Sequence, residues 1–193
     1  QAVTGTPGHV NAMAASVGYF LEKYPADSMQ PGDVYVTNDP WLGTGHLFDF
    51  TVVTPVCLDD IMVGLFASTV HVVDIGGIGF SPDSGQIFEE GLCVPIMPLF
   101  SQGQANEHLF EIVRANVREP EQVVGDLYSL ASSNDVGTRR LRALMRESGL
   151  GDLDALGDHI ISTSRRAMET AIGRLPSGVF ENSMIVDGYD RPI

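Results

Sequence analysis

Two apolar, β-branched runs place the strongest constraint on how this chain can fold. One run covers residues 50–56 and the other residues 61–71, with a short turn at Asp59-Asp60 between them. Runs of this composition are typical of strands, and a short polar connection favours an antiparallel hairpin. Such a hairpin would bring the residues before Phe50 close to those after Val70. The pattern therefore predicts a pair of antiparallel strands in which the start of the first strand lies beside the end of the second.

A His followed three positions later by an Asp occurs at each of these two ends. His46 and Asp49 come just before the first run, and His71 and Asp74 come at the end of the second. Imidazole nitrogen and carboxylate oxygen are ligands that borderline divalent metals accept. A single His-x-x-Asp spacing is weak evidence, since a loop carboxylate can simply hydrogen-bond a histidine. Two spacings that converge on one end of a sheet favour a metal site.

The rest of the chain predicts an α+β fold. Helical periodicity and strand-like composition are well separated along the sequence. We expect a mixed, mainly antiparallel sheet with a long Gly-rich loop, packed by an N-terminal helix and by three or four C-terminal helices. Helices are expected at residues 10–24, 106–117, 123–149 (as one helix or two) and from a cap at Asp152 to Leu175, and further strands at residues 33–37, 94–100 and 179–186.

Charge and composition narrow the possible partners. The 193 residues include 25 Asp and Glu against 11 Lys and Arg, for a net charge of −14. Nucleic acids and anionic membrane surfaces need clustered basic residues, so we expect neither as a partner. Cys57 and Cys93 both lie among apolar residues, which predicts buried free thiols and a reducing, cytoplasmic location. No phosphate-binding glycine motif is present, so we do not expect ATP chemistry on this chain alone.

Several further polar residues have both a chemical and a plainer interpretation. Asp39 could orient a ligand histidine, or it could form the turn that ends a strand. Glu90 could serve as a general acid or base, as a fourth ligand, or as a solvated carboxylate. His9 is a possible ligand or a polar residue at the start of a helix. His108 and His159 are expected on solvated helix faces.

A series of short motifs, in order over nearly the whole chain, carries a family resemblance. The motifs are Gly32-Asp33-Val34, Asn38-Asp39-Pro40, both His-x-x-Asp pairs with Gly76-Gly77, Ile87-Phe88-x-Glu90-Gly91-Leu92, Ala115-Asn116-Val117-Arg118, Gly125-Asp126-Leu127, Gly137-x-Arg139-Arg140-Leu141 and Pro176-x-Gly178-Val179-Phe180. This series resembles the hydantoinase B/oxoprolinase family. The family includes N-methylhydantoinase B subunits, the C-terminal part of 5-oxoprolinases and the α-type subunits of acetone and acetophenone carboxylases. Its members are much longer, so the resemblance implies that residues 1–193 are one segment of a larger domain, truncated at both ends.

The resemblance implies a reaction shared between two subunits. An A-type partner with an actin-like fold binds ATP and activates a carbonyl or amide oxygen by phosphorylation. This chain would then act in a metal-dependent, ATP-dependent amidohydrolase that opens a hydantoin, 5-oxoproline or a similar small lactam, within a hetero-oligomer. One alternative is a subunit of an acetone- or acetophenone-type carboxylase. Another, of a different class, is a non-catalytic assembly module.

The resemblance also implies roles for individual residues. In the carboxylases the matching positions bind a divalent metal, which implies His46, Asp49 and His71 as ligands of zinc, manganese or iron. Asp74 and His9 are candidates for a fourth ligand. A metal at this place could polarise a carbonyl or lower the pKa of a water.

The expected catalytic residues are the carboxylates around these ligands, namely Asp74, Glu90 and Asp39. Three positions depart from the family pattern, one of them Asn11, which replaces a Gly in the loop of His9. Val72 stands where many hydantoinase-type members have a second histidine, and Gln86 stands where an acidic residue is common. These departures leave open both the choice between lactam and ketone substrates and the identity of any fourth ligand.

Overall fold

The computed structural model describes residues 9–59, 61–79, 81–185, 187 and 188, apart from the side chains of residues 9 and 10. The chain divides into two compact units, residues 1–152 and residues 153–193. Among the described helices, none combines the length and the apolar character that a membrane span requires.

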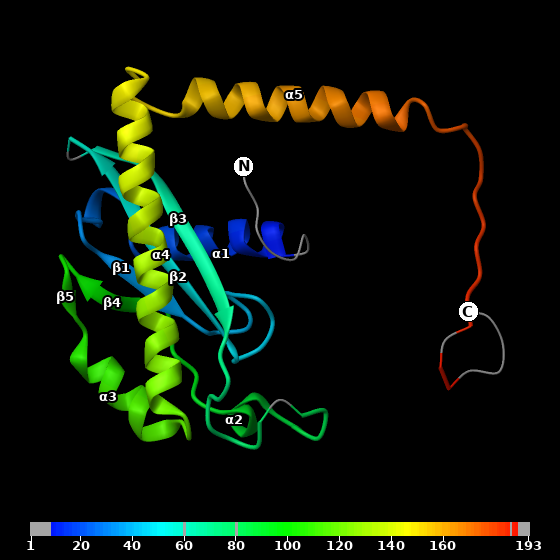
Figure 1. Cartoon of the computed structure of the whole chain (residues 1–193). Coiled ribbons are helices and arrows are strands. Elements are labelled where there is room, and N and C mark those ends of the chain that lie inside the picture. The colour runs from blue at the N-terminus through cyan, green and yellow to red at the C-terminus, as the bar shows by residue number, and fades with distance from the viewer. Residues whose placement is uncertain (1–8, 60, 80, 186, 189–193) are drawn as a thin grey trace. The chain divides into compact units, whose positions relative to one another are not determined.

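A five-stranded sheet forms the centre of the first unit (Figure 1). Its strands lie in the order β3-β2-β1-β4-β5, and every neighbouring pair is antiparallel. The strands are β1 (Val34–Thr37), β2 (Asp49–Leu58), β3 (Ile61–His71), β4 (Met97–Ser101) and β5 (Gln104–Ala105). This sheet and its helices confirm the α+β class, and the direct pairing of β2 with β3 confirms the predicted hairpin.

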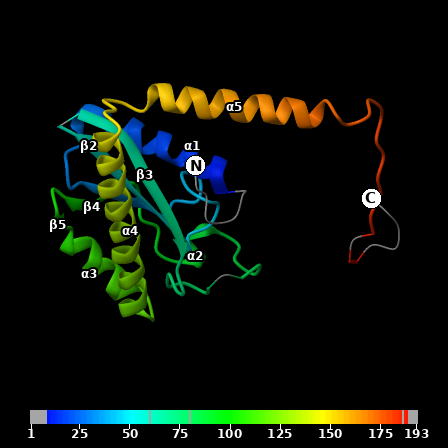
Figure 2. The same cartoon turned by 45° about the horizontal axis from the view of Figure 1, so that its top comes forward.

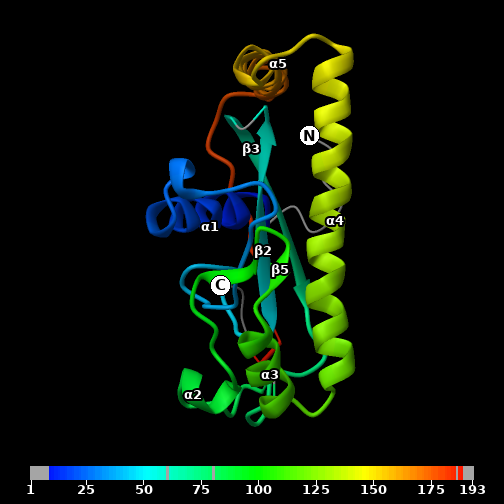
Figure 3. The ribbon, with the colours of Figure 1, turned by 90° about the vertical axis from the view of Figure 1, so that its left-hand side faces the viewer.

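Successive side chains of each strand point to opposite faces of the sheet, and both faces are covered. Phe50 and Val52 lie in the larger core, together with buried residues of α3 (Glu107–Asn116) and α4 (Pro120–Glu147). Val53 lies in a second core with Phe20 of α1 (His9–Lys23). Figures 2 and 3 show α1 and α4 on opposite sides of the sheet. This arrangement explains why β2 is apolar on both faces.

Helix α4 is one continuous helix rather than two, and specific contacts fix it on the hairpin. The side-chain amide of Asn134 donates to the carbonyl of Val52 and to the hydroxyl of Thr54, each at 3.2 Å. Gly137 allows close approach of β3, because a Cβ there would lie 2.8 Å from the ring of Phe66. The helix α3 before it is capped as expected, with Asn106 accepting from the backbone of Leu109.

The remaining local structure corrects three expectations. Helix α5 (Asp154–Ile172) begins after Leu153 without a side-chain cap, so the predicted cap at Asp152 is wrong. Residues 179–185 form no strand, since no other described segment of their unit offers one to pair with. Cys57 is buried, but Cys93 is exposed despite its apolar neighbours. Two short helical turns, η1 (Ala26–Ser28) and α2 (Ile87–Glu90), complete the described elements.

Candidate metal centre and the adjoining pocket

Asp49 and His71 face one another across the open end of the β2–β3 hairpin. They are register partners, being the first residue of β2 and the last of β3. The Oδ1 atom of Asp49 lies 2.9 Å from Nδ1 of His71. The Asp49 residue is only 4% exposed, whereas the side chain of His71 is 53% exposed. The hairpin therefore holds a buried carboxylate beside an imidazole that solvent can reach.

His46 completes the cluster from the loop that leads into β2. Its Nε2 lies 3.4 Å from Oδ2 of Asp49, and its ring meets that of His71 edge to face, with 5.0 Å between centroids. The loop is fixed next to it because the side-chain amide of Asn38 donates to the carbonyl of Leu47 at 2.7 Å. One ligand atom from each of the three residues lies within 4.8 Å of the other two.

Neighbouring side chains hold the ligand groups in place. Thr44 donates its hydroxyl proton to Oδ2 of Asp49 at 2.6 Å. The ring of Phe48 stacks on that of His71, with 5.3 Å between centroids and 16° between planes. Such outer contacts orient metal ligands in many proteins. Two imidazoles and one carboxylate on a half-open surface fit a divalent metal that keeps positions free for water or substrate.

Asp74, the second member of the other His-x-x-Asp pair, lies apart from this cluster. Its carboxylate forms an ion pair with Arg118, with 2.6 Å between Oδ1 and Nη1. It also accepts from the backbone N–H of Arg118 and, at 3.3 Å, from that of Gly76. Burial alone would raise the pKa of Asp74, but these backbone hydrogen bonds and the guanidinium charge outweigh burial and lower the pKa below its usual value. Among the described residues, the metal-capable group contains only His46, Asp49 and His71.

The glycines around Asp74 let three backbone segments pack closely. A Cβ on Gly76 would lie 2.5 Å from the carbonyl oxygen of Asn116, and one on Gly91 would overlap that of Ile75. Both glycines have positive φ angles, 80° and 140°, which side chains strongly disfavour. The Gly-rich loop is thus pinned to the end of α3 on one side and to the segment after α2 on the other.

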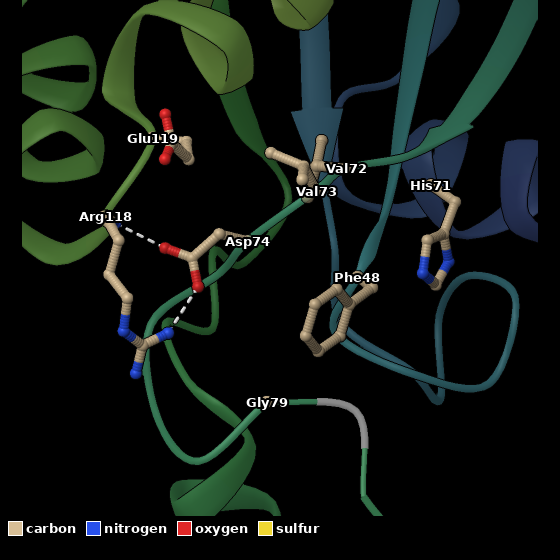
Figure 4. A pocket seen from close by; sticks show the side chains of 8 residues that line it. All are labelled: Phe48, His71, Val72, Val73, Asp74, Gly79, Arg118 and Glu119. Atoms are coloured by element: carbon tan, nitrogen blue, oxygen red, sulfur yellow. Dashed lines mark hydrogen bonds and ion pairs between the residues drawn. The ribbon is translucent and has the colours of Figure 1, made fainter.

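A pocket of about 460 Å³ lies beside the His/Asp cluster (Figure 4). His71 stands at one side of it, and Arg118 with Glu119 stands at the other. Apolar side chains lie between them, from Phe48, Val72 and Val73. A small molecule in this pocket would have an apolar contact surface, a ligand histidine on one flank and a guanidinium–carboxylate pair on the other.

Asp39 and Glu90 do not line this pocket. Asp39 accepts from the backbone N–H of Trp41 at 3.0 Å, which is the turn-forming arrangement. Glu90 is half-buried, and its Oε2 is shielded from solvent without a hydrogen-bond partner in the described structure. The side chain of His9 lies outside the described residues. His108 and His159 are exposed, as expected.

Three residues hold the site together through contacts that the sequence patterns did not indicate. Asn38 links three segments, because it also donates to the carbonyl of Leu92 and accepts from the backbone of Val94. Thr44 holds Asp49, and Arg118 holds Asp74. Arg118 and Asn38 both lie in the short motifs that carry the family resemblance, so those motifs contained the only sequence signal for them.

Comparison with known proteins agrees with the sequence motifs. The family model described as hydantoinase B/oxoprolinase matches residues 1–193. The chain belongs to this family. The beta subunit of the caprolactamase of Pseudomonas jessenii is 28% identical over 181 residues, which cover 92% of this chain and 30% of that subunit.

Two solved structures share the fold. The crystal structure of the ATP-dependent caprolactamase from Pseudomonas jessenii matches 92% of this chain and 31% of its own, with a TM-score of 0.81 and 26% identity. A nucleotide-free acetone carboxylase matches 77% of this chain and 20% of its own, with a TM-score of 0.65. At 19% identity, the second match shows the fold alone. The chain thus spans about three tenths of the caprolactamase chain that it matches.

Proposed function

We propose that this chain forms the metal-dependent catalytic part of an ATP-dependent amidohydrolase that opens a hydantoin, 5-oxoproline or a similar lactam. The observation that carries the proposal is the convergence of His46, Asp49 and His71 beside a pocket. Membership of the hydantoinase B/oxoprolinase family and the likeness to a caprolactamase favour a cyclic amide as the substrate.

The residues around the pocket have distinct tasks in this proposal. When bound, the metal would supply Lewis acidity for a carbonyl oxygen or for a water. The hydroxyl of Thr44 orients Asp49, and Phe48 fixes the plane of the His71 ring. Phe48, Val72 and Val73 would contact the apolar part of a small ring. Asp74 holds Arg118 at the far wall, so its contribution is to position the guanidinium group.

The proposal includes a partner subunit. An A-type subunit with an actin-like fold would bind ATP and phosphorylate the amide oxygen, and the site on this chain would then complete ring opening. The name of the caprolactamase beta subunit supports a multi-subunit enzyme. A cytoplasmic hetero-oligomer is the assembly that we expect.

Activity measurements on the full-length polypeptide, purified with its A-type partner, test this function. ATP-dependent turnover of lactams and hydantoins should be compared with ATP consumption that depends on acetone or acetophenone and bicarbonate. We expect activity with a cyclic amide. Activity with a ketone alone would make the chain a carboxylase subunit, and full activity after His46→Ala would contradict a catalytic role for the cluster.

A further inference from the structure

The two edges of the sheet differ sharply in how well they are protected against further pairing. Strand β5, at one edge, has two residues, and its neighbour β4 contains Pro98. Strand β3, at the other edge, has eleven residues from Ile61 to His71. It contains no proline, and it carries no charged residue before His71. Natural proteins normally shorten, bend or charge an exposed edge, because a long flat one pairs with other strands.

The hydrogen-bonding groups of β3 can be assigned to its two sides. The backbone N–H of Val72 donates to the carbonyl of Phe48, next to the paired residues Asp49 and His71. Since paired and unpaired groups alternate along an antiparallel strand, the N–H groups of Phe66, Ser68 and Val70 point to β2. Those of Leu65, Ala67 and Thr69 therefore point away from the sheet. No strand of the described structure lies on that side.

The side chains of β3 show that its two faces are already covered. Residues 62–70 are all half-buried, and both α1 and α4 contact the strand. The open backbone edge is thus flanked by a helix above and a helix below. Such a slot admits one more strand, and it offers a donor and an acceptor at every second residue.

We propose that a strand from the same polypeptide, outside residues 1–193, pairs with the free edge of β3. The caprolactamase that shares this fold carries about 69% of its chain outside the matched part, which supplies ample polypeptide for such a strand. A second copy of this segment is disfavoured by its net charge of −14, because two such segments repel each other. A strand of the same chain also avoids the entropy that two separate molecules lose on association.

The added strand would extend the sheet alongside the candidate metal centre. His71 is the last residue of β3, and its side chain is half exposed. By the same alternation the backbone N–H of His71 points away from β2, so pairing along β3 would reach the backbone of His71 directly. The edge pairing does not depend on whether the cluster binds metal, so the two proposals can fail separately.

Hydrogen exchange at residue resolution in the full-length polypeptide tests the pairing. The purified polypeptide is measured without its partner subunit and at two concentrations. We expect the amides of Leu65, Ala67 and Thr69 to exchange as slowly as those of Phe66 and Ser68, at least about 100-fold slower than in an unfolded chain. Fast exchange of the outward amides would overturn the proposal. Protection that appears only with the partner subunit would indicate a strand of that subunit, and protection that grows with protein concentration would indicate a second copy of this chain. Either result would overturn the proposal.

A proline substitution provides a second test with a matched control. Ala67→Pro removes an outward N–H, which an unpaired edge strand tolerates and a paired one does not. Ala67→Ser changes the side chain at the same place but keeps that N–H. We expect Ala67→Pro to lower the melting temperature of the full-length polypeptide by several degrees more than Ala67→Ser. Equal melting temperatures would contradict pairing at this edge.

Discussion

The two His-x-x-Asp pairs have the same spacing but different structures around them. In the first pair, Asp49 lies between His46 and His71 and accepts a hydrogen bond from Thr44. In the second pair, Asp74 turns away from the cluster and binds Arg118. One pair therefore contributes both of its residues to the candidate metal centre, and the other contributes only its histidine.

The position of each Asp relative to its strand accounts for the difference. Asp49 is the first residue of β2, so the register places it opposite His71. Asp74 lies three residues beyond the end of β3, in a loop where Gly76, with a φ of 80°, packs against the end of α3. The same sequence spacing thus yields a ligand pair only where the strand register brings the carboxylate back to the site.

The largest effect is expected when a histidine of the cluster is removed. His46→Ala or His71→Ala in the full-length protein, assayed with its A-type partner, should lower kcat/KM about 100-fold or more, because even outer contacts of metal ligands matter 10- to 100-fold. His108→Ala is the matched control, since His108 is exposed on α3. Equal loss of activity in all three variants would remove the distinction between the cluster and any other histidine.

A substitution in the loop of the second pair should affect stability rather than chemistry. Gly76→Ala combines a disfavoured φ with a close approach to the Asn116 carbonyl, so we expect a loss of about 2–4 kcal/mol in the free energy of unfolding. Gly79→Ala has the same kind of φ, 88°, but open space around it. It should cost about 1–2 kcal/mol. Urea unfolding of the two variants measures the difference, and equal losses would contradict the close packing at Gly76.

Removal of the Asp74 carboxylate should cost somewhat less. Asp74→Ala leaves the backbone N–H groups of Arg118 and Gly76 without their acceptor, which should reduce the free energy of unfolding by about 1–3 kcal/mol. Asp74→Asn, which keeps one acceptor oxygen, should cost less than Asp74→Ala. A variant as stable as the wild type would show that the Arg118 contact does not hold this loop.

The smallest effect is a change of stability with pH. The pKa of Asp74 is lower in the folded protein than its usual value, so its contribution to stability is fully present above about pH 4 and is lost as the pH falls through the folded pKa. The difference in the free energy of unfolding between wild type and Asp74→Asn should therefore shrink as the pH falls below about 4. Urea unfolding across this range checks the trend. A difference in the free energy of unfolding that grows on acidification would contradict a lowered pKa of Asp74 in the folded protein.

The sequence predicted the structure well where the pattern lies in neighbouring residues. It predicted less where the structure depends on contacts between residues far apart in the chain. Two β-branched runs and a short turn were enough to predict the hairpin, and the hairpin brought His46, Asp49 and His71 together. The partner of Asp74 could not be predicted in the same way, because Arg118 lies 44 positions away and reaches it through the turn between α3 and α4. The apolar run at residues 179–186 indicated a strand, but a strand needs a neighbour, which local composition does not reveal.

Exposure was equally hard to predict from neighbouring residues. Cys57 lies inside β2 and is buried, whereas Cys93 has apolar neighbours but lies in an irregular segment and is exposed. Apolar neighbours predict burial only where the backbone points the side chain inward. The roles of Asp39 and Glu90 in catalysis stay predictions, as does the identity of the metal.

Metal analysis of the full-length protein and two matched variants tests the central claim most directly. Asp49→Asn and Asp74→Asn make the same chemical change at the same position of the two His-x-x-Asp pairs. After dialysis against equal concentrations of zinc, manganese and iron, the wild type and Asp74→Asn should each retain about one equivalent of divalent metal. Asp49→Asn should retain far less. Equal metal content in the two variants, or loss of metal only in Asp74→Asn, would contradict the assignment of the metal centre to His46, Asp49 and His71.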